Sequence, residues 1–171
     1  ARALRSVLVA LVLLLPGWAG ARALPPAVEA VTGALQLAGE GEMRWFGLKL
    51  YDAALWVDTA DKAGVGKAIG AEHALVIRYA RSIAGQRLVD TSLDEMRRLG
   101  ERDEGRLARW RTLLEKALPS VEPGETLVGL YRPGGRGGLC HEVRSSAPLG
   151  ASDLARAFFA ANAIFYAAVW A

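Results

Sequence analysis

An arginine and a tyrosine stand seven residues apart in the stretch GEGEMRWFGLKLYDAALWV, which covers residues 39–57. A guanidinium can hold a carboxylate through two parallel hydrogen bonds, and a phenol can donate one more. Arg44 and Tyr51 are therefore the first residues to consider as a binding site for an acid, because most of their neighbours are apolar. A second interpretation is structural, with Arg44 paired to Glu42 or Asp52 and Tyr51 an ordinary strand aromatic.

The spacing of the two residues decides whether they can act together. Side chains alternate between the two faces of a strand, so an offset of seven places Arg44 and Tyr51 on opposite faces of one straight strand. They meet on one face only if the chain turns at Gly47 or a β-bulge shifts the register. The Gly-Glu-Gly at 39–41 favours such a bulge. Both interpretations remain open at this point.

The first residues have the pattern of a secretory signal peptide. Arg2 and Arg5 precede the nine-residue apolar run Val7–Leu15, and a small-x-small sequence ends at Ala23. A retained membrane anchor is the alternative, but nine apolar residues fall short of the ~20 that a span needs. We therefore expect cleavage near Ala23 and a periplasmic or secreted mature protein. Residues 1–23 are the predicted signal peptide.

Residues 24–171 are long enough for one domain with its own core. The predicted signal peptide contains three arginines and no acid, so the net charge of +3 belongs entirely to it. A mature chain without net charge gives no general electrostatic case for a nucleic-acid partner. The uncharged run 157–171 is also too short for a stable membrane span in the mature protein.

Cys140 is the only cysteine, which excludes an intramolecular disulfide. The two histidines, His73 and His141, complete a thin set of metal ligands without CxxC or HxxxH spacing. We therefore expect no metal and no cofactor.

The hydrophobic pattern of the mature chain places strands first and helices after them. Period-two alternation predicts two strands over 34–57, joined at Gly47, and a third over 73–81. Period 3.6 and the breakers Gly100 and Pro119 predict two helices. The two helices are predicted over 86–99 and 101–118. They are followed by a turn at 122–125, a strand over 125–133, a hairpin loop over 133–138, a return strand over 139–145 and a last helix over 151–171. Residues 58–70 are predicted to form a loop or short irregular helix.

Segregated strands and helices favour an α+β fold in which helices cover one face of an antiparallel sheet. The two predicted helices carry many arginines, interleaved with acids. This interleaving favours a solvated face with i,i+4 ion pairs rather than a nucleic-acid surface.

Four segments occur in an order typical of a known family. They are GEGEMRWFGLKLYDAALWV, HALVIRYARSIAGQRLVDTSLDEMRRLG, LPSVEPGETLVGLYRPG and LGASDLARAFF. Together they resemble the bacterial, secreted chalcone isomerase-like proteins over residues 34–159. The resemblance implies an open-faced β-sandwich, a large antiparallel sheet with a helical layer over one side.

The resemblance also implies roles for individual residues. The catalytic arginine of the plant isomerases lies in a Gly-x-Gly-x-Arg context, which residues 39–44 approximate with one extra residue, so Arg44 carries over. Tyr51, Thr91 and Arg98 or Met96 stand where those enzymes have Thr, Tyr and Asn. Three of the four positions differ, and a bulky Arg98 in place of a neutral amide argues against flavanone cyclisation.

The non-catalytic, fatty-acid-binding members of the superfamily pair that arginine with a strand tyrosine, as Arg44 and Tyr51 would be here. The implied function is a non-enzymatic binding protein for a small lipophilic carboxylate, held in a cleft between sheet and helices. Further ligand-binding candidates are Tyr79, Thr91, Met96 and Arg98. One alternative is an isomerase or lyase that uses Arg44 as electrophile and Tyr51 as acid or base. Another is a scaffold that binds a protein partner through the uncharged C-terminal tail.

Overall fold

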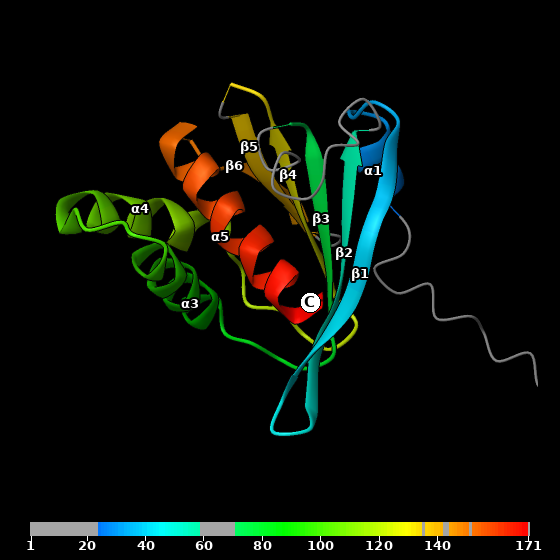
Figure 1. Cartoon of the computed structure of the whole chain (residues 1–171), viewed down its shortest axis with the longest axis horizontal. Coiled ribbons are helices and arrows are strands. Elements are labelled where there is room, and N and C mark those ends of the chain that lie inside the picture. The colour runs from blue at the N-terminus through cyan, green and yellow to red at the C-terminus, as the bar shows by residue number, and fades with distance from the viewer. Residues whose placement is uncertain (1–23, 59–70, 135, 142–143, 151, 171) are drawn as a thin grey trace, which may run out of the picture.

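The computed structural model describes residues 24–58, 71–134, 136–141, 144–150 and 152–170. The strands are β1 Leu35–Trp45, β2 Leu48–Asp58, β3 His73–Tyr79, β4 Thr126–Arg132, β5 Arg136–His141 and β6 Arg144–Pro148. The helices are α1 Pro26–Glu29, α3 Gly85–Arg98, α4 Glu104–Ala117 and α5 Ser152–Trp170. The strands form one antiparallel sheet in the order β1-β2-β3-β4-β5-β6, with α3, α4 and α5 on one side (Figure 1). The predicted α+β fold is confirmed.

The core lies between the sheet and the three long helices, because alternate residues of the central strands are apolar on that face. The sheet contributes Ala53 and Leu55 of β2, Leu75, Ile77 and Tyr79 of β3, Leu127 and Tyr131 of β4, and Leu139 of β5. The helices contribute Val89, Leu93 and Met96 of α3, Leu107, Trp110 and Leu114 of α4, and Leu154, Phe158 and Phe159 of α5.

A smaller apolar cluster lies on the opposite face of the sheet. Val28 of the short helix α1 packs with Leu24 against Ala54, Val76 and Val128. The central strands are therefore apolar on both faces of the sheet, but the helices cover one face much more extensively than the other. The sheet is open on the α1 side and thickly covered on the other.

Two glycines allow α5 to approach the sheet closely. A Cβ atom at Gly129 would lie 2.7 Å from Cε1 of Phe159, and one at Gly137 would lie 2.9 Å from Cβ of Ala155. Real Cβ contacts are not this short, so any larger residue at either position would push the helix outward. The glycines of β4 and β5 are thus part of the core.

The β1–β2 hairpin turns at Phe46 and Gly47, which both have positive φ, 47° and 78°. Two consecutive residues of this kind are typical of a two-residue hairpin turn. The register also shifts between Leu37 and Gly39 and again between Met43 and Arg44. The turn at Gly47 and a bulge near the Gly-Glu-Gly at 39–41, both expected from the sequence, are confirmed.

The ends of α3 and α4 follow local chemistry. Gly100, with φ of 114°, closes α3, and the N–H groups of Gly100 and Glu101 donate to the carbonyls of Arg97 and Met96. These two hydrogen bonds form a Schellman motif. The prediction that Gly100 ends the helix is therefore confirmed. Helix α4 begins three residues later than predicted, because the side chain of Asp103 accepts a hydrogen bond from the N–H of Arg106 and caps the helix there.

Three features differ from the sequence-based expectation. The hairpin loop predicted over 133–138 is shorter, since β5 already begins at Arg136. Its glycines favour a loop by composition, but Gly137 is needed where α5 lies close. Neither α1 nor β6 was predicted: α1 has four residues and β6, RSSAP, has a weak strand pattern and is paired along one edge only. The expectation for 59–70 falls outside the described residues.

Candidate functional site

Tyr51 and Tyr79 form a cross-strand pair on the helix-covered face of the sheet. They are direct partners in the β2–β3 register, and their rings meet edge to face with centroids 5.9 Å apart. Tyr79 is buried and Tyr51 is half-buried. The pair thus brings two phenol groups to the boundary of an apolar layer.

Tyr79 is held in its neutral form. Burial, with a smaller contribution from Tyr51, raises the pKa of the Tyr79 phenol far above its ordinary value. A phenol that stays protonated donates a hydrogen bond and is a poor proton acceptor. Its chemistry therefore suits recognition of an oxygen acceptor better than base catalysis.

Arg44 lies next to the hairpin turn and bonds to the hairpin itself. Its Nε donates to Oε1 of Glu42 at 2.5 Å, and a terminal nitrogen donates to the carbonyl of Gly47 at 3.2 Å. The hydrogen bond and the ion pair raise the pKa of Arg44 and lower that of Glu42. The structural interpretation, in which Arg44 pairs with Glu42, describes this state of the molecule.

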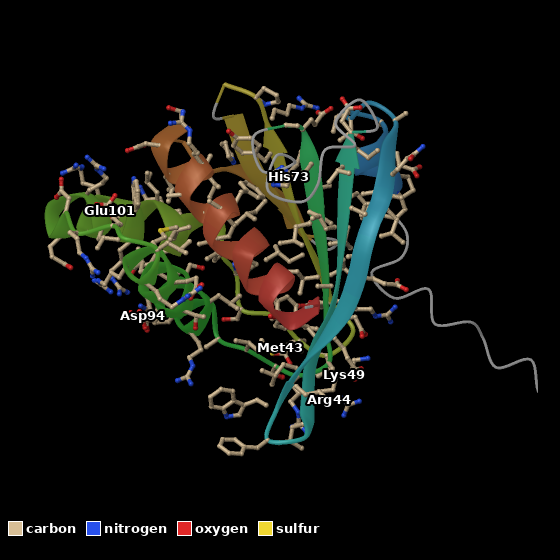
Figure 2. The ribbon with its side chains drawn as sticks, in the orientation of Figure 1. Met43, Arg44, Lys49, His73, Asp94 and Glu101 are labelled. Atoms are coloured by element: carbon tan, nitrogen blue, oxygen red, sulfur yellow. The ribbon has the colours of Figure 1, made fainter. Side chains whose placement is uncertain are left out.

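The charged residues of the hairpin gather on the face opposite Tyr51. Glu42 pairs with Asp52 and Met43 with Tyr51, so strand alternation separates these two pairs. The ammonium group of Lys49 lies 2.6 Å from Asp52 and 3.5 Å from Glu42, on the side where Arg44 also bonds. The turn and the bulge therefore leave Arg44 and Tyr51 on different faces of the hairpin. Figure 2 labels Met43, Arg44 and Lys49 on this hairpin.

The other predicted ligand-binding residues are dispersed. Met96 is buried in the same layer as Tyr79. Thr91 is exposed on α3. Arg98 is exposed as well, and its Nε donates to Oε2 of Glu95 at 2.9 Å, which raises its pKa. The structure thus brings Tyr51, Tyr79 and Met96 to one side of the sheet and leaves Thr91 and Arg98 at the surface.

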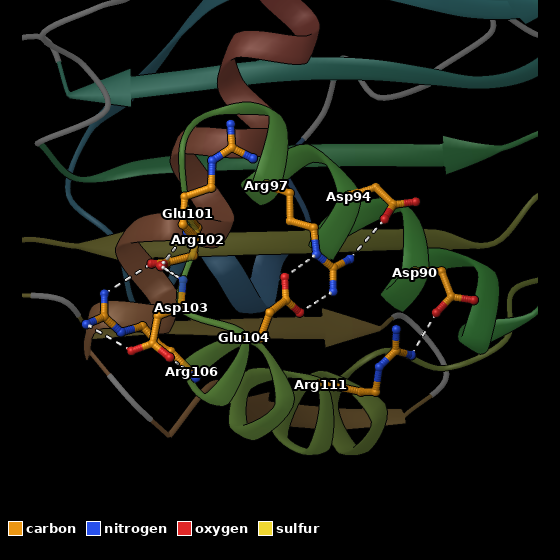
Figure 3. A network of polar contacts seen from close by, with 9 residues as sticks. All are labelled: Asp90, Asp94, Arg97, Glu101, Arg102, Asp103, Glu104, Arg106 and Arg111. Carbon is orange, nitrogen blue, oxygen red and sulfur yellow. Dashed lines mark hydrogen bonds and ion pairs between the residues drawn. The ribbon is translucent and has the colours of Figure 1, made fainter.

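Arg97 of α3 and Arg106 and Arg111 of α4 pair with acids, as the interleaved sequence predicted (Figure 3). Arg97 bridges Asp94 and Glu104, both at 3.1 Å, and Arg111 lies 2.7 Å from Asp90. Arg111 and Glu115, 3.8 Å apart, have the expected i,i+4 spacing, whereas the shorter contacts join i,i+3 neighbours or the two helices to each other. The network connects α3 to α4 and is a solvated polar face.

Metal ligands do not gather in the described part of the chain, where no three His, Cys, Asp or Glu side chains are grouped closely enough to hold an ion. His73 is buried, stacks on Tyr131 and meets Phe159 edge to face. It is part of the aromatic core beneath α5. Within the described ranges, none of the helices has the length and apolar character that a bilayer span requires.

One group of residues escaped the sequence analysis. The alternation over 34–57 includes Trp45 and Leu48 and so predicts that they are buried, but the structure exposes them with Phe46 at the hairpin tip. The exposed fractions of Trp45, Phe46 and Leu48 are 63%, 90% and 50%. The available signal was their position: Trp45 and Leu48 flank the two-residue turn and Phe46 is part of it, and such a turn lies at the end of a hairpin rather than inside a core.

The architecture and its covered face define a chalcone isomerase-like fold, an open-faced sandwich of one antiparallel sheet and a helical layer. A crystal structure that it resembles is that of a fatty-acid binding protein of Arabidopsis thaliana, with a TM-score of 0.52 and 12% identity. The match covers 78% of this chain and 90% of that one. No protein-family model matches the sequence, and no curated protein matches it.

Proposed function

We propose that this protein binds a lipophilic carboxylic acid of the fatty-acid type between the sheet and the helices and performs no chemistry on it. The observation that carries the proposal is the Tyr51–Tyr79 pair, two phenols at the boundary of a predominantly apolar layer. The fold supports it, because a protein of the same architecture is a fatty-acid binding protein. The neutral Tyr79 favours binding over acid–base catalysis.

The apolar layer supplies affinity for the alkyl chain. Ile77, Val89 and Met96 lie in the same cluster as Tyr79, and each ligand methylene buried there would contribute ~0.8 kcal/mol. The two phenols would then orient the carboxylate by hydrogen bonds. In a layer of low dielectric constant such bonds are stronger than in water.

Arg44 is proposed to supply the charge that balances the carboxylate. Its bond to Glu42 is exposed to water on an edge strand, and exposed ion pairs are weak. The side chain would leave Glu42 and turn toward Tyr51 when the ligand arrives. Glu42 is thus a competing carboxylate, and its removal should strengthen binding.

Titration of oleate into the protein by calorimetry tests these roles with four variants. Tyr51→Phe and Arg44→Ala should each weaken binding about tenfold, the loss of one charge-assisted or neutral hydrogen bond in a dry site. Glu42→Gln should strengthen it. Arg98→Ala removes an arginine that is likewise paired to a nearby glutamate, but on α3, and should leave the affinity unchanged.

Three results would each contradict a part of the proposal. Failure of the wild type to bind any long-chain acid would exclude the function itself. Binding that is indifferent to Tyr51→Phe would exclude this site while leaving the function in place. A Glu42→Gln variant with unchanged affinity would remove Arg44 from the site, because relief of a competitor must be visible if Arg44 is the anchor.

The same proposal places the mature domain outside the cytoplasm, on the basis of the basic, apolar and small-residue pattern of residues 1–23. Expression in a Gram-negative host, followed by fractionation and N-terminal sequencing of the periplasmic protein, would test it. A product that starts at Leu24 is expected. Full-length protein retained in the cytoplasm would contradict both the proposed location outside the cytoplasm and the proposed cleavage site.

A further inference from the structure

The β1–β2 hairpin carries an apolar tip that lies apart from the core. Of the six exposed large hydrophobic side chains in the described residues, Trp45, Phe46 and Leu48 are adjacent at this turn. The tip projects past the helices and the other strand ends (Figure 1). Grouped apolar exposure of this kind marks a surface that another phase or molecule covers.

The tip is also preformed. The rings of Trp45 and Phe46 meet edge to face with centroids 5.2 Å apart, and Trp45 pairs with Leu48 in the strand register. Phe46 holds a positive φ of 47°, which is unfavourable for a bulky residue. A less strained residue would make the same turn, so the phenylalanine side chain itself is the feature to explain.

We propose that this tip inserts into the interfacial region of a lipid bilayer. Trp45, Phe46 and Leu48 form an apolar end cap, and the next pair in the register is Arg44 with Lys49. The change from apolar to charged side chains therefore occurs at one level on both strands. Long basic side chains at such a level can place their charges in the headgroup layer while the aromatic rings lie deeper.

The hairpin backbone suits that environment. Only structures whose backbone groups are internally paired enter a low-dielectric phase cheaply, and a two-residue turn leaves few groups unpaired. Tryptophan is favoured at bilayer interfaces because its ring is apolar and its N–H polar. Each inserted side chain adds transfer free energy roughly in proportion to the apolar area removed from water.

A protein partner fits the tip less well. Three side chains with these exposed fractions would bury on the order of 400 Å², about half of what each partner gives to a stable protein interface. Insertion into lipid needs no matching surface, so a small projecting tip suffices. The inference goes beyond the proposed function and does not depend on whether the core binds an acid.

The charges beneath the tip predict the lipid dependence. Arg44 and Lys49 are each bonded to an acid, Glu42 or Asp52, so this part of the hairpin is close to neutral. Binding should therefore be similar on phosphatidylcholine vesicles with and without phosphatidylglycerol. A strong requirement for anionic lipid is the behaviour of a polybasic surface and would overturn the proposed mode.

The test uses full-length protein, vesicle co-sedimentation and fluorescence quenching by brominated phosphatidylcholine. Phe46→Asn should weaken partitioning about tenfold. This variant creates the Asn-Gly pair that the turn prefers, so it should fold at least as well as the wild type. The matched control is Leu99→Ser, which removes a 40% exposed leucine at the end of α3 and should leave partitioning unchanged.

Residues 1–23 are the same in every variant, and comparing the quenching of the wild type with that of Trp45→Phe separates Trp45 from the other four tryptophans. Quenching present in the wild type and reduced in Trp45→Phe supports the proposal. Equal quenching in both proteins, or Phe46→Asn that partitions like the wild type, overturns it. Self-association that is abolished by Phe46→Asn, without vesicle binding, would instead assign the tip to a second copy of the chain.

Discussion

The ring of Phe159 lies over the backbone of Gly129, so closely that a Cβ atom there would be 2.7 Å from Cε1 of the ring. This contact sets how near α5 lies to the sheet. It thereby controls the space in the layer where we propose that a ligand binds.

Gly129→Ala should destabilise the protein by about 1–3 kcal/mol, because the added methyl group must displace a fully buried ring or the helix that carries it. Urea denaturation of wild type and variant measures the change. Phe159→Leu in the same chain should recover part of the loss, giving a coupling energy above about 0.5 kcal/mol. Gly33→Ala, where the nearest atom would be 3.7 Å away, is the control and should be nearly neutral. Simple additivity of the Gly129 and Phe159 changes would contradict the contact.

Gly100 should tolerate asparagine better than alanine. Its φ of 114° lies outside the range comfortable for most side chains, and it closes α3 through the Schellman bonds. We expect Gly100→Ala to cost about 1–2 kcal/mol and Gly100→Asn less, because asparagine adopts positive φ more readily. Thermal denaturation of the two variants side by side gives the order. Equal stability of both would mean that the helix ends without strain.

The cap of α4 should be sensitive to acid. The N–H of Arg106 donates to the Asp103 carboxylate and lowers the pKa of Asp103 below its ordinary 3.8. A carboxyl group with a lowered pKa in the folded state stabilises above its unfolded pKa, and this stabilisation is lost as the pH falls through the folded value. At neutral pH Asp103→Ala should therefore melt earlier than the wild type, and the difference should shrink below about pH 4.

Asp103→Asn is the control for this charge effect, since an amide oxygen also caps a helix. It should retain most of the melting temperature at neutral pH and show a weaker dependence on acid. A difference between Asp103→Ala and wild type that is constant from neutral to acidic pH would assign the effect to shape rather than to the carboxylate.

Phe46→Asn should raise the melting temperature, whereas Phe46→Ala should not. Asparagine adopts positive φ readily and so relieves the backbone strain at this turn position. Alanine lacks the side-chain amide that makes this conformation favourable and does not relieve the strain. The 90% exposed phenylalanine contributes little to packing in the monomer. Differential scanning calorimetry of the two variants decides the matter. A lower melting temperature for Phe46→Asn would show that the aromatic contact with Trp45 outweighs the strain.

The regular elements were predictable because their information is local. Period-two alternation marks β1, β2 and β3, and helical periodicity marks α3 and α4. The stops were also local, since Gly47 and Gly100 are needed for positive φ. Helix α1 and strand β6 were missed because each is short and depends on the rest of the sheet for its partners.

The candidate site was also predictable only in part from the sequence. Residue types alone indicated that Arg44 and Tyr51 could bind an acid, and the offset of seven predicts opposite faces for the two residues on one straight strand. Their faces depend on the turn and on the register shift between Met43 and Arg44, which local sequence does not specify. Tyr79 was proposed by alignment, and only the β2–β3 register places it against Tyr51.

The sequence by itself determined most of the strands and the long helices, and where glycine must end or turn them, because backbone conformation and hydrophobic period act over a few residues. The tertiary structure decided the rest: Tyr51 meets Tyr79, Arg44 bonds to Glu42, and Trp45 and Phe46 project from the core. These outcomes depend on strand register and on the extent of the helical layer. Both are settled by contacts between residues far apart in the chain, where one shift in pairing moves a side chain from the core to water.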